Sequence, residues 1–274
     1  MRNRNRRNRL GLRTVALGYL AVLLLVPVGF VFYRTFEHGV SAAWHAVTTP
    51  SAMHAFWLTI ELVAIAVPLN TVFGVVMAMA LVRGRFRGRS VVGALVDLPL
   101  ALSPVVIGLA LILVWGTKGW FGQWLTDHGL QVIFSFPGLL LATIFVSLPF
   151  VVRETVPVLR EIGTEQEEAA ETLGAGAFQT FRRVTMPAIR WGVAYGVILT
   201  TARALGEFGA VSVVSGHLAG STETLTLQVE DRYEAFDLTG AYAAAAVLAL
   251  IAVATLASMT LLRRRRGDVA WASS

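Results

Sequence analysis

The stretch "TARALGEFGA" contains two ionisable residues, one of which could bind an anion. Arg203 and Glu207 are four residues apart, so on a helix they share one face and can pair. The guanidinium fork of an arginine also matches the oxygens of a tetrahedral oxyanion, which makes Arg203 a candidate transient ligand for a divalent oxyanion. The alternative is a structural pair in which Arg203 and Glu207 only neutralise each other.

Three serines offer hydroxyl groups to the same chemistry. Ser103 precedes Pro104, where a kink would free backbone amides, and Ser212 and Ser215 follow Glu207 along the chain. Hydroxyls and exposed amides can hydrate an anion without trapping it, as a conduit requires. Serines also bond to carbonyls of their own helix, and this alternative stays open. Together with Arg203 and Glu207, the three serines form a tentative translocation pathway.

Other kinds of chemistry find no support in the sequence. A loop that binds the phosphates of ATP needs a lysine after a glycine-rich run, but the only lysine, Lys118, stands in "GTKGW". The absence of cysteine excludes thiol catalysis and cysteine-ligated metals. The histidines are dispersed and lack the spacing of metal ligands: His38, His45, His54, His128 and His217. We therefore predict no catalytic residue, no metal site and no cofactor held by this chain.

The elements that must position these residues are membrane helices. The chain has 274 residues, of which 55% are hydrophobic and 15% charged, a composition typical of integral membrane proteins. Six stretches reach the roughly 20 residues that a bilayer crossing needs. They are 14–33, 56–82, 91–116, 131–152, 188–214 and 241–262. We expect an all-α membrane protein with a six-span domain over 14–262, with kinks at the prolines inside its spans.

The arginines predict the orientation of these spans. Nineteen of the 23 Arg and Lys residues fall on one side of the membrane under this topology. The positive-inside rule places that side in the cytoplasm, with both basic tails, 1–13 and 263–274, and the connection 153–187. Because the basic residues follow membrane topology, the net charge of +6 needs no nucleic acid as a partner.

The connection contains a segment that reads as a short helix in water, "GTEQEEAAETLGAGAFQTFRRVTMP". Thr164 followed by Glu167 predicts a capping box, and Gly174 predicts a left-handed helix end. A helix of about nine residues is marginal alone in water, so it must dock on something. The apolar stripe that Phe178 begins fits a partner's groove or the underside of the chain's own bundle, and the residues alone leave both open.

The same segment resembles the EAA loop of ABC importer permeases. The resemblance lies in Glu168-Ala169-Ala170, then Gly174, then Met186-Pro187 at the family's spacing, with Val184 and Met186 in place of Ile and Leu. It implies a type I importer permease fold and a coupling loop that inserts into a cleft of an ATPase subunit. The implied coupling residues are Glu168, Ala169, Ala170, Gly174, Phe178 and Pro187.

Residues 202–233 and the stretch "DLPLALSPVVIG" at 97–108 resemble the sulfate and thiosulfate permeases, in particular their CysW-type subunit. The resemblance implies a multi-pass, non-enzymatic subunit of the bacterial plasma (inner) membrane that carries sulfate or thiosulfate into the cytoplasm. The implied partners are two ATPase subunits that bind ATP and Mg, a paralogous CysT-type permease as heterodimer, an extracytoplasmic sulfate-binding protein and membrane lipid. Two alternatives remain: a homodimeric molybdate or tungstate permease, and an ion-driven secondary anion carrier.

Overall fold

The computed structural model describes the backbone of residues 2–272 and the side chains of residues 13–255, 257, 258 and 260. Every regular element in this part of the chain is a helix. Except for Arg13, the side chains of the two predicted basic tails lie outside the described residues. The elements are α1 (Arg2–Phe36), α2 (Val40–Val47), α3 (Pro50–Arg83), α4 (Arg89–Ala101), α5 (Pro104–Trp115), α6 (Gly122–Asp127), α7 (Phe136–Ser147), α8 (Pro149–Glu161), α9 (Glu165–Thr172), α10 (Ala177–Thr180), the π-helical turn η1 (Phe181–Thr185), α11 (Met186–Leu205), α12 (Gly209–Val214), α13 (Leu225–Glu234) and α14 (Leu238–Ala272).

Four helical stretches of the described chain are long and apolar enough to cross a membrane. They are Arg13–Phe36, Pro50–Arg83, Phe136–Glu161 and Leu238–Thr255. A fifth span forms if α4 and α5 are taken together, although they meet at 112°. The predicted span 188–214 is divided, because α11 ends at Leu205 and α12 begins at Gly209. The all-helical membrane fold is confirmed, whereas the count of six spans stays a prediction.

Prolines divide some of the predicted spans and leave others continuous. Pro104 begins α5 and Pro149 begins α8, so both stand where a helix starts afresh and a missing N–H costs no hydrogen bond. Helices α1, α3 and α4 continue through their prolines, which are Pro27, Pro68 and Pro99. The kink expected beside Pro104 is therefore confirmed, where α4 and α5 meet at 112°.

Small residues bring three helices into close contact. A Cβ at Gly74 of α3 would lie 2.5 Å from the Cβ of Val151 in α8, and a Cβ at Gly196 of α11 would lie 2.7 Å from the Cα of Val151. Glycine at such crossings lets backbones approach, which favours packing in membrane bundles. Val151 is fully buried and belongs to an apolar cluster with Ile189 and Leu159. We call α3, α8 and α11 the three-helix core.

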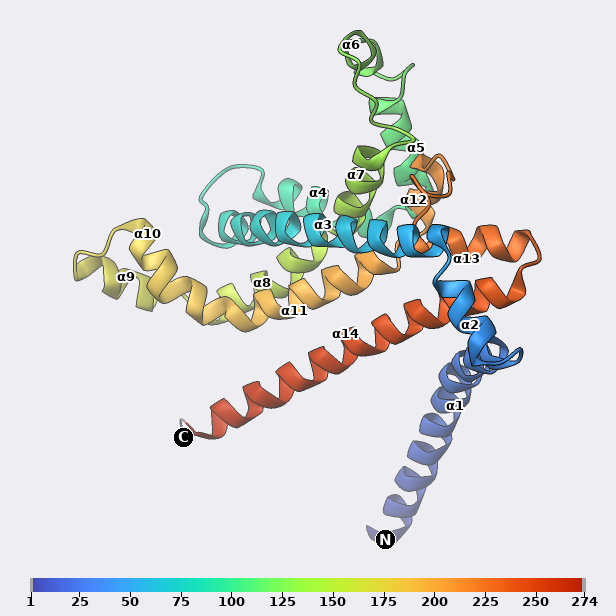
Figure 1. Cartoon of the computed structure of the whole chain (residues 1–274). Coiled ribbons are helices and arrows are strands. Elements are labelled where there is room, and N and C mark those ends of the chain that lie inside the picture. Colours follow the sequence, from blue (N-terminus) through green and yellow to red (C-terminus); the bar gives the residue numbers. More distant parts are fainter. Residues whose placement is uncertain (1, 273–274) are drawn as a thin grey trace.

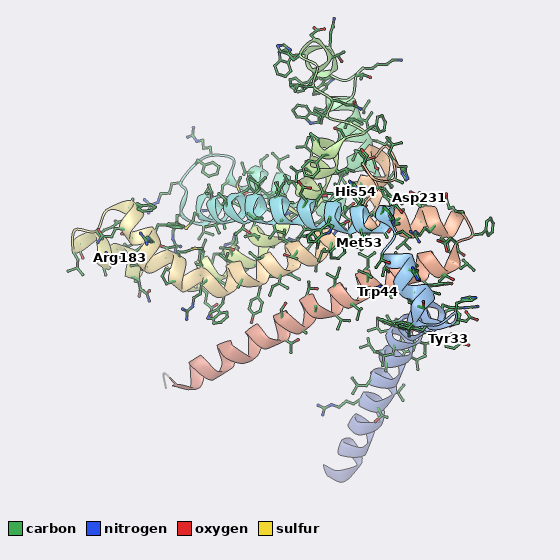
Figure 2. The ribbon with its side chains drawn as sticks, in the orientation of Figure 1. Tyr33, Trp44, Met53, His54, Arg183 and Asp231 are labelled. Atoms are coloured by element: carbon green, nitrogen blue, oxygen red, sulfur yellow. The ribbon has the colours of Figure 1, made fainter. Side chains whose placement is uncertain are left out.

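The three-helix core is elongated, and different helices lie at its two ends (Figure 1). Helices α9 and α10 lie at one end of the core, and α2 and α13 lie at the other. Figure 2 marks these ends with Arg183 and Asp231. Helices α5, α6 and α7 form a lobe that projects sideways, and α1 stands apart from the core. The segments with predicted functions therefore lie at the α9–α10 end and where the lobe joins the core.

Candidate transport pathway and coupling surface

The predicted pair of Arg203 and Glu207 is present at the end of α11. The Nη1 of Arg203 lies 2.7 Å from the Oε2 of Glu207. The Glu207 side chain is 2% exposed and that of Arg203 is 30% exposed. Glu207 also accepts a hydrogen bond from the N–H of Ala210 at 2.9 Å, so its carboxylate ties the pair to the start of α12. The pairing is confirmed, and the contact of Arg203 with an anion stays a prediction.

The break between α11 and α12 lies against the break between α4 and α5. A Cβ at Gly209 would lie 3.0 Å from the Cβ of Pro104 and 3.6 Å from the backbone nitrogen of Val105. Ser103 stands in this second break; it is exposed, and no side-chain hydrogen bond caps α5 there. Non-helical backbone at membrane depth is tolerated where protein covers it or where it lines a water-filled path. The fold thus brings Ser103 into the same region as the Arg203 pair.

The other two predicted pathway serines are engaged within the protein. The hydroxyl of Ser212 donates to the carbonyl of Gly209 at 3.1 Å, which is the back-bonding alternative. The hydroxyl of Ser215 donates to the carbonyl of Thr222 at 2.7 Å and accepts from the N–H of His217 at 3.0 Å. Contact of either hydroxyl with an anion would require these bonds to rearrange.

His217 is not isolated in space. Its Nδ1 lies 3.3 Å from Asp231, and its Nε2 lies 3.1 Å from the carbonyl of Ser212. Burial lowers the pKa of His217, but its hydrogen bonds to Ser212 and Asp231 and the negative charges of Asp231 and Glu230 together raise it by more, so the pKa lies above its ordinary value of 6.5. Candidate ligand atoms of His217, Glu230 and Asp231 lie within 4.8 Å of one another. Because both ring nitrogens already have partners, we interpret this group as a polar cluster; the prediction of no metal site stays a prediction.

At the opposite end, the coupling segment has the predicted short helix and turn. Helix α9 covers Glu165–Thr172, and Gly174 follows with φ +85°. The N–H of Gly174 donates to the carbonyl of Glu171 at 2.9 Å, and that of Ala175 donates to the carbonyl of Ala170 at 3.0 Å. This pair of bonds is the Schellman end of a helix, which glycine favours. The expected left-handed end at Gly174 is confirmed.

The predicted capping box is wrong. The hydroxyl of Thr164 donates to the carboxylate of Glu168 at 2.7 Å instead of accepting from the backbone of α9. Thr164 has φ −109° and ψ −7°, not the extended conformation that a capping residue takes. Glu167, the other half of the expected box, is drawn to Arg83 instead, at 2.8 Å.

A groove of 660 Å³ lies between α9 and the start of α11. Three of the predicted coupling residues line it, namely Ala169, Ala170 and Pro187, together with Gln166, Leu173, Arg183, Val184, Ala188 and Arg190. Glu168 is exposed beside it, and Phe178 is 75% exposed. Small side chains line a groove flanked by basic ones, so the surface can receive an apolar segment of a protein partner that carries acidic groups.

Arg83 holds this segment against the core, a role that no local pattern in the sequence predicts. The Nε of Arg83 donates to Glu167 at 2.8 Å, its Nη1 to the carbonyl of Leu159 at 3.1 Å, and its Nη2 to the carbonyl of Gly163 at 2.6 Å. The hydroxyl of Thr185 donates to Glu167 at 2.7 Å. We call these five residues the Arg83 network. In the sequence, Arg83 counted only as a cytoplasmic charge, because nothing local relates it to a glutamate 84 residues away.

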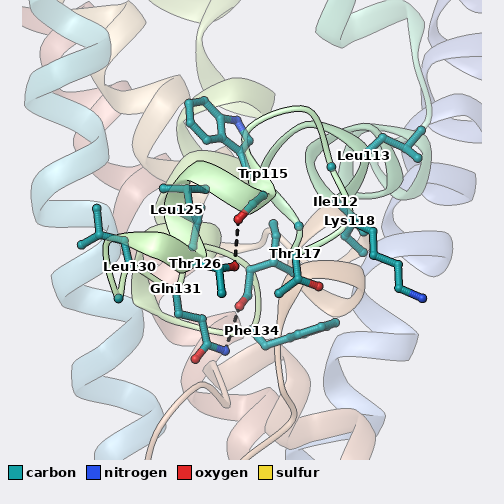
Figure 3. A pocket seen from close by; sticks show the side chains of 16 residues that line it. Ile112, Leu113, Trp115, Thr117, Lys118, Leu125, Thr126, Leu130, Gln131 and Phe134 are labelled. Carbon is teal, nitrogen blue, oxygen red and sulfur yellow. Dashed lines mark hydrogen bonds between the residues drawn. The ribbon is translucent and has the colours of Figure 1, made fainter.

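A cavity of 460 Å³ lies in the lobe, between the end of α5, α6 and residues 129–134 (Figure 3). Its lining is largely apolar, with Lys118 as the charged member. The polar side chains Thr126 and Gln131 hydrogen-bond to the carbonyls of Gly122 and Ile133. None of the predicted pathway or coupling residues lines this cavity.

Comparisons with known proteins match the chain to membrane components of transport systems. A family model described as "Binding-protein-dependent transport system inner membrane component" matches residues 70–268. The chain is 51% identical to the sulfate transport system permease protein CysW of Synechocystis over 92% of each chain. It is 37% identical to the sulfate transport system permease protein CysT of Escherichia coli over 93% of each chain.

A solved structure shares the fold. It is a bacterial alginate ABC transporter in complex with an alginate pentasaccharide-bound periplasmic protein. The match has a TM-score of 0.71 and covers 96% of each chain, at 15% sequence identity. The chain therefore belongs to the inner membrane components of binding-protein-dependent transport systems, in the group of the sulfate transport system permeases.

Proposed function

We propose that this chain is the permease subunit of an ATP-driven importer that moves sulfate or thiosulfate into the cytoplasm. The main support for this substrate is the 51% identity to a sulfate permease over 92% of both chains. The geometry agrees with it, because a partly exposed guanidinium stands beside two meeting helix breaks. Discontinuous helices surround the substrate sites of many transporters.

The ion pair of Arg203 and Glu207 suits a site of weak, transient anion binding better than a site of tight binding. Arg203 is 30% exposed and offers donors to oxyanion oxygens, as does the exposed Ser103 in the neighbouring break. Glu207, held 2.7 Å from Arg203, offsets most of the positive charge that an anion would meet. A site that attracts an anion weakly allows it to leave on the other side, as conduction requires.

The proposed topology has six spans with both termini in the cytoplasm of a bacterial cell, in the inner membrane. Helices α4 and α5 would make the third span, and α11 with α12 the fifth. The basic loop between α3 and α4 then lies on the same side as α9 and α10, in accord with the positive-inside rule.

The proposed partners follow from the surfaces that the chain leaves open. Two ATPase subunits would supply ATP and Mg binding, one of them docking on the groove beside α9. A CysT-type permease would pair with this chain. The most apolar stretch of α1 has no buried residue, so α1 leaves surface for that subunit and for lipid. An extracytoplasmic sulfate-binding protein would dock at the end marked by α2 and α13.

Competition experiments test the proposed substrate. The importer is reconstituted with its partners in vesicles, and uptake of labelled sulfate is measured with excess thiosulfate or molybdate. We expect thiosulfate to suppress the uptake strongly and molybdate to suppress it weakly. Uptake of labelled molybdate in preference to sulfate would replace the proposed substrate with the molybdate class.

A further inference from the structure

Polar contacts, not burial, fix the orientation of α9. The helix has no buried residue. Within the described chain, the side-chain hydrogen bonds that join α9 to other elements all end on Glu167, from Arg83 and Thr185. A short helix without an apolar anchor keeps one orientation only while such contacts hold it. Glu167 is therefore the attachment point of α9.

Arg83 joins that attachment point to two other segments. It is the last residue of α3, and its Nη atoms donate to the carbonyls of Leu159 in α8 and Gly163 in the turn before α9. The side chains of Arg83 and Glu167 are only 18% and 15% exposed, so salt screens their attraction less than that of a surface pair. One guanidinium thus fixes the end of α3, the end of α8 and the position of α9.

Thr185 extends the connection to α11. Its side chain is buried, and its hydroxyl donates to the same carboxylate of Glu167 at 2.7 Å. Thr185 is the last residue of η1, the π-helical turn that leads directly into α11. Turns of this kind interrupt regular helices and are frequent at functional positions. Helix α11 in turn carries Arg203 at its far end.

We propose that Arg83 is a positioning residue that transmits displacements of α9 to α3 and α11. When an ATPase subunit moves α9, Glu167 carries the displacement through Arg83 to α3 and through Thr185 to α11, and so to the helix break beside Arg203. Without the Arg83 network, α9 still meets the ATPase, but its movement no longer reaches the core. The inference rests on the proposed function, because it assigns the network a role in ATP-driven transport.

Neutral variants separate positioning from simple stabilisation. The double variant Arg83→Gln with Glu167→Gln leaves no charge unpaired, so it removes the network without stranding an ion. We expect near-normal amounts of assembled importer and near-normal ATP hydrolysis, with the ratio of sulfate carried to ATP hydrolysed lowered about tenfold, within the usual range of coupling energies. Thr185→Val, which removes only the hydroxyl, lowers the ratio in the same direction.

Two controls make the comparison specific. Arg83→Lys keeps the charge but cannot form the forked contacts, so it should behave as a loss variant. Arg87→Gln removes an exposed arginine from the loop that follows α3 and should keep the wild-type ratio. If Arg83 and Glu167 only neutralise each other, the double variant should instead keep the wild-type ratio of sulfate carried to ATP hydrolysed, because neither charge is then unpaired.

Spin-label distances provide a readout that does not depend on transport. The chain has no cysteine, so Glu171→Cys on α9 and Val76→Cys on the exposed face of α3 can be labelled alone. In the assembled importer we expect a narrow distance distribution that shifts when ATP binds, and a broad one that does not shift in the double variant. A wild-type importer that fails to carry sulfate would refute the proposed substrate and leave this distance test in force. Wild-type distances and a wild-type ratio in the double variant would overturn the inference.

Discussion

Replacement of Gly174 by alanine tests how the coupling segment is aimed. Gly174 ends α9 with φ +85°, a conformation that residues with a Cβ rarely adopt. A Cβ at this position would meet no heavy atom within 4 Å, so an added methyl group clashes with no neighbour. The cost of Gly174→Ala therefore lies in the backbone alone, and Gly174→Val adds a branched side chain to the same cost.

The expected magnitude follows from that backbone cost. Left-handed backbone costs an L-residue about 1–2 kcal/mol. Since about 1.4 kcal/mol corresponds to a factor of ten, the correctly turned segment loses about 5- to 30-fold in population relative to misdirected ones. If only the correct turn binds the ATPase subunit, the apparent Kd rises by up to that factor, less where the native turn has stability in reserve.

The assay is a titration of the purified permease with its ATPase subunit, followed by uptake in vesicles. Gly176→Ala is the matched control, because Gly176 has φ −72° and its Cβ would also meet nothing within 4 Å. Gly174→Asn should recover part of the affinity, since asparagine tolerates the left-handed region. Equal affinities for wild type, Gly174→Ala and Gly174→Val would show that the left-handed turn at Gly174 does not orient the coupling segment toward the ATPase subunit.

Three further predictions concern single contacts. Glu168→Lys places a cation in the first turn of α9, where it opposes the helix dipole and removes the acceptor of the Thr164 hydroxyl. The presented helix is thereby destabilised, so ATPase co-purification should fall while membrane insertion stays normal; unchanged co-purification and uptake would count against docking at this site. Arg203→Gln leaves the carboxylate of Glu207, which is 2% exposed, without its partner, at a cost on the order of 3 kcal/mol. The amount of protein in the membrane should therefore fall and should recover when Glu207→Gln is added. If uptake also recovers in the double variant, Arg203 does not belong to the pathway; if uptake stays low, it does. Since the pKa of His217 is raised in the folded protein, its contact with Asp231 stabilises the protein fully below about pH 6.5 and loses this effect as pH rises through the folded pKa. The Tm difference between wild type and His217→Gln should therefore shrink from about pH 5.5 to about pH 8.5. A constant difference would show that the contact with Asp231 does not depend on the protonation of His217.

Local patterns in the sequence predicted what depends on neighbouring residues. Glycine after a short polar helix predicted the turn at Gly174, and the spacing of four predicted the pair of Arg203 and Glu207, because both features form within one or two helical turns. Pro104 predicted a break between α4 and α5 but not its 112° angle, which depends on how α5 packs beside α12.

Long-range contacts explain what the sequence did not reveal. The capping box failed because Arg83, distant in sequence, draws Glu167 to itself. The five histidines are dispersed along the sequence, yet His217 contacts Asp231 because the loop after α12 folds back on α13. Hydrophobicity predicts one continuous helix over 188–214, whereas the chain breaks at Glu207, whose carboxylate accepts a hydrogen bond from the N–H of Ala210.

One measurement decides whether this chain imports its substrate with energy from a partner ATPase. Labelled sulfate uptake is followed in vesicles that contain the chain with its permease, ATPase and binding-protein partners. We predict uptake that requires ATP on the ATPase side and persists when proton and sodium gradients are collapsed. Uptake by this chain alone, driven by a proton or sodium gradient and independent of ATP, would show an ion-driven carrier instead of an ATP-driven importer.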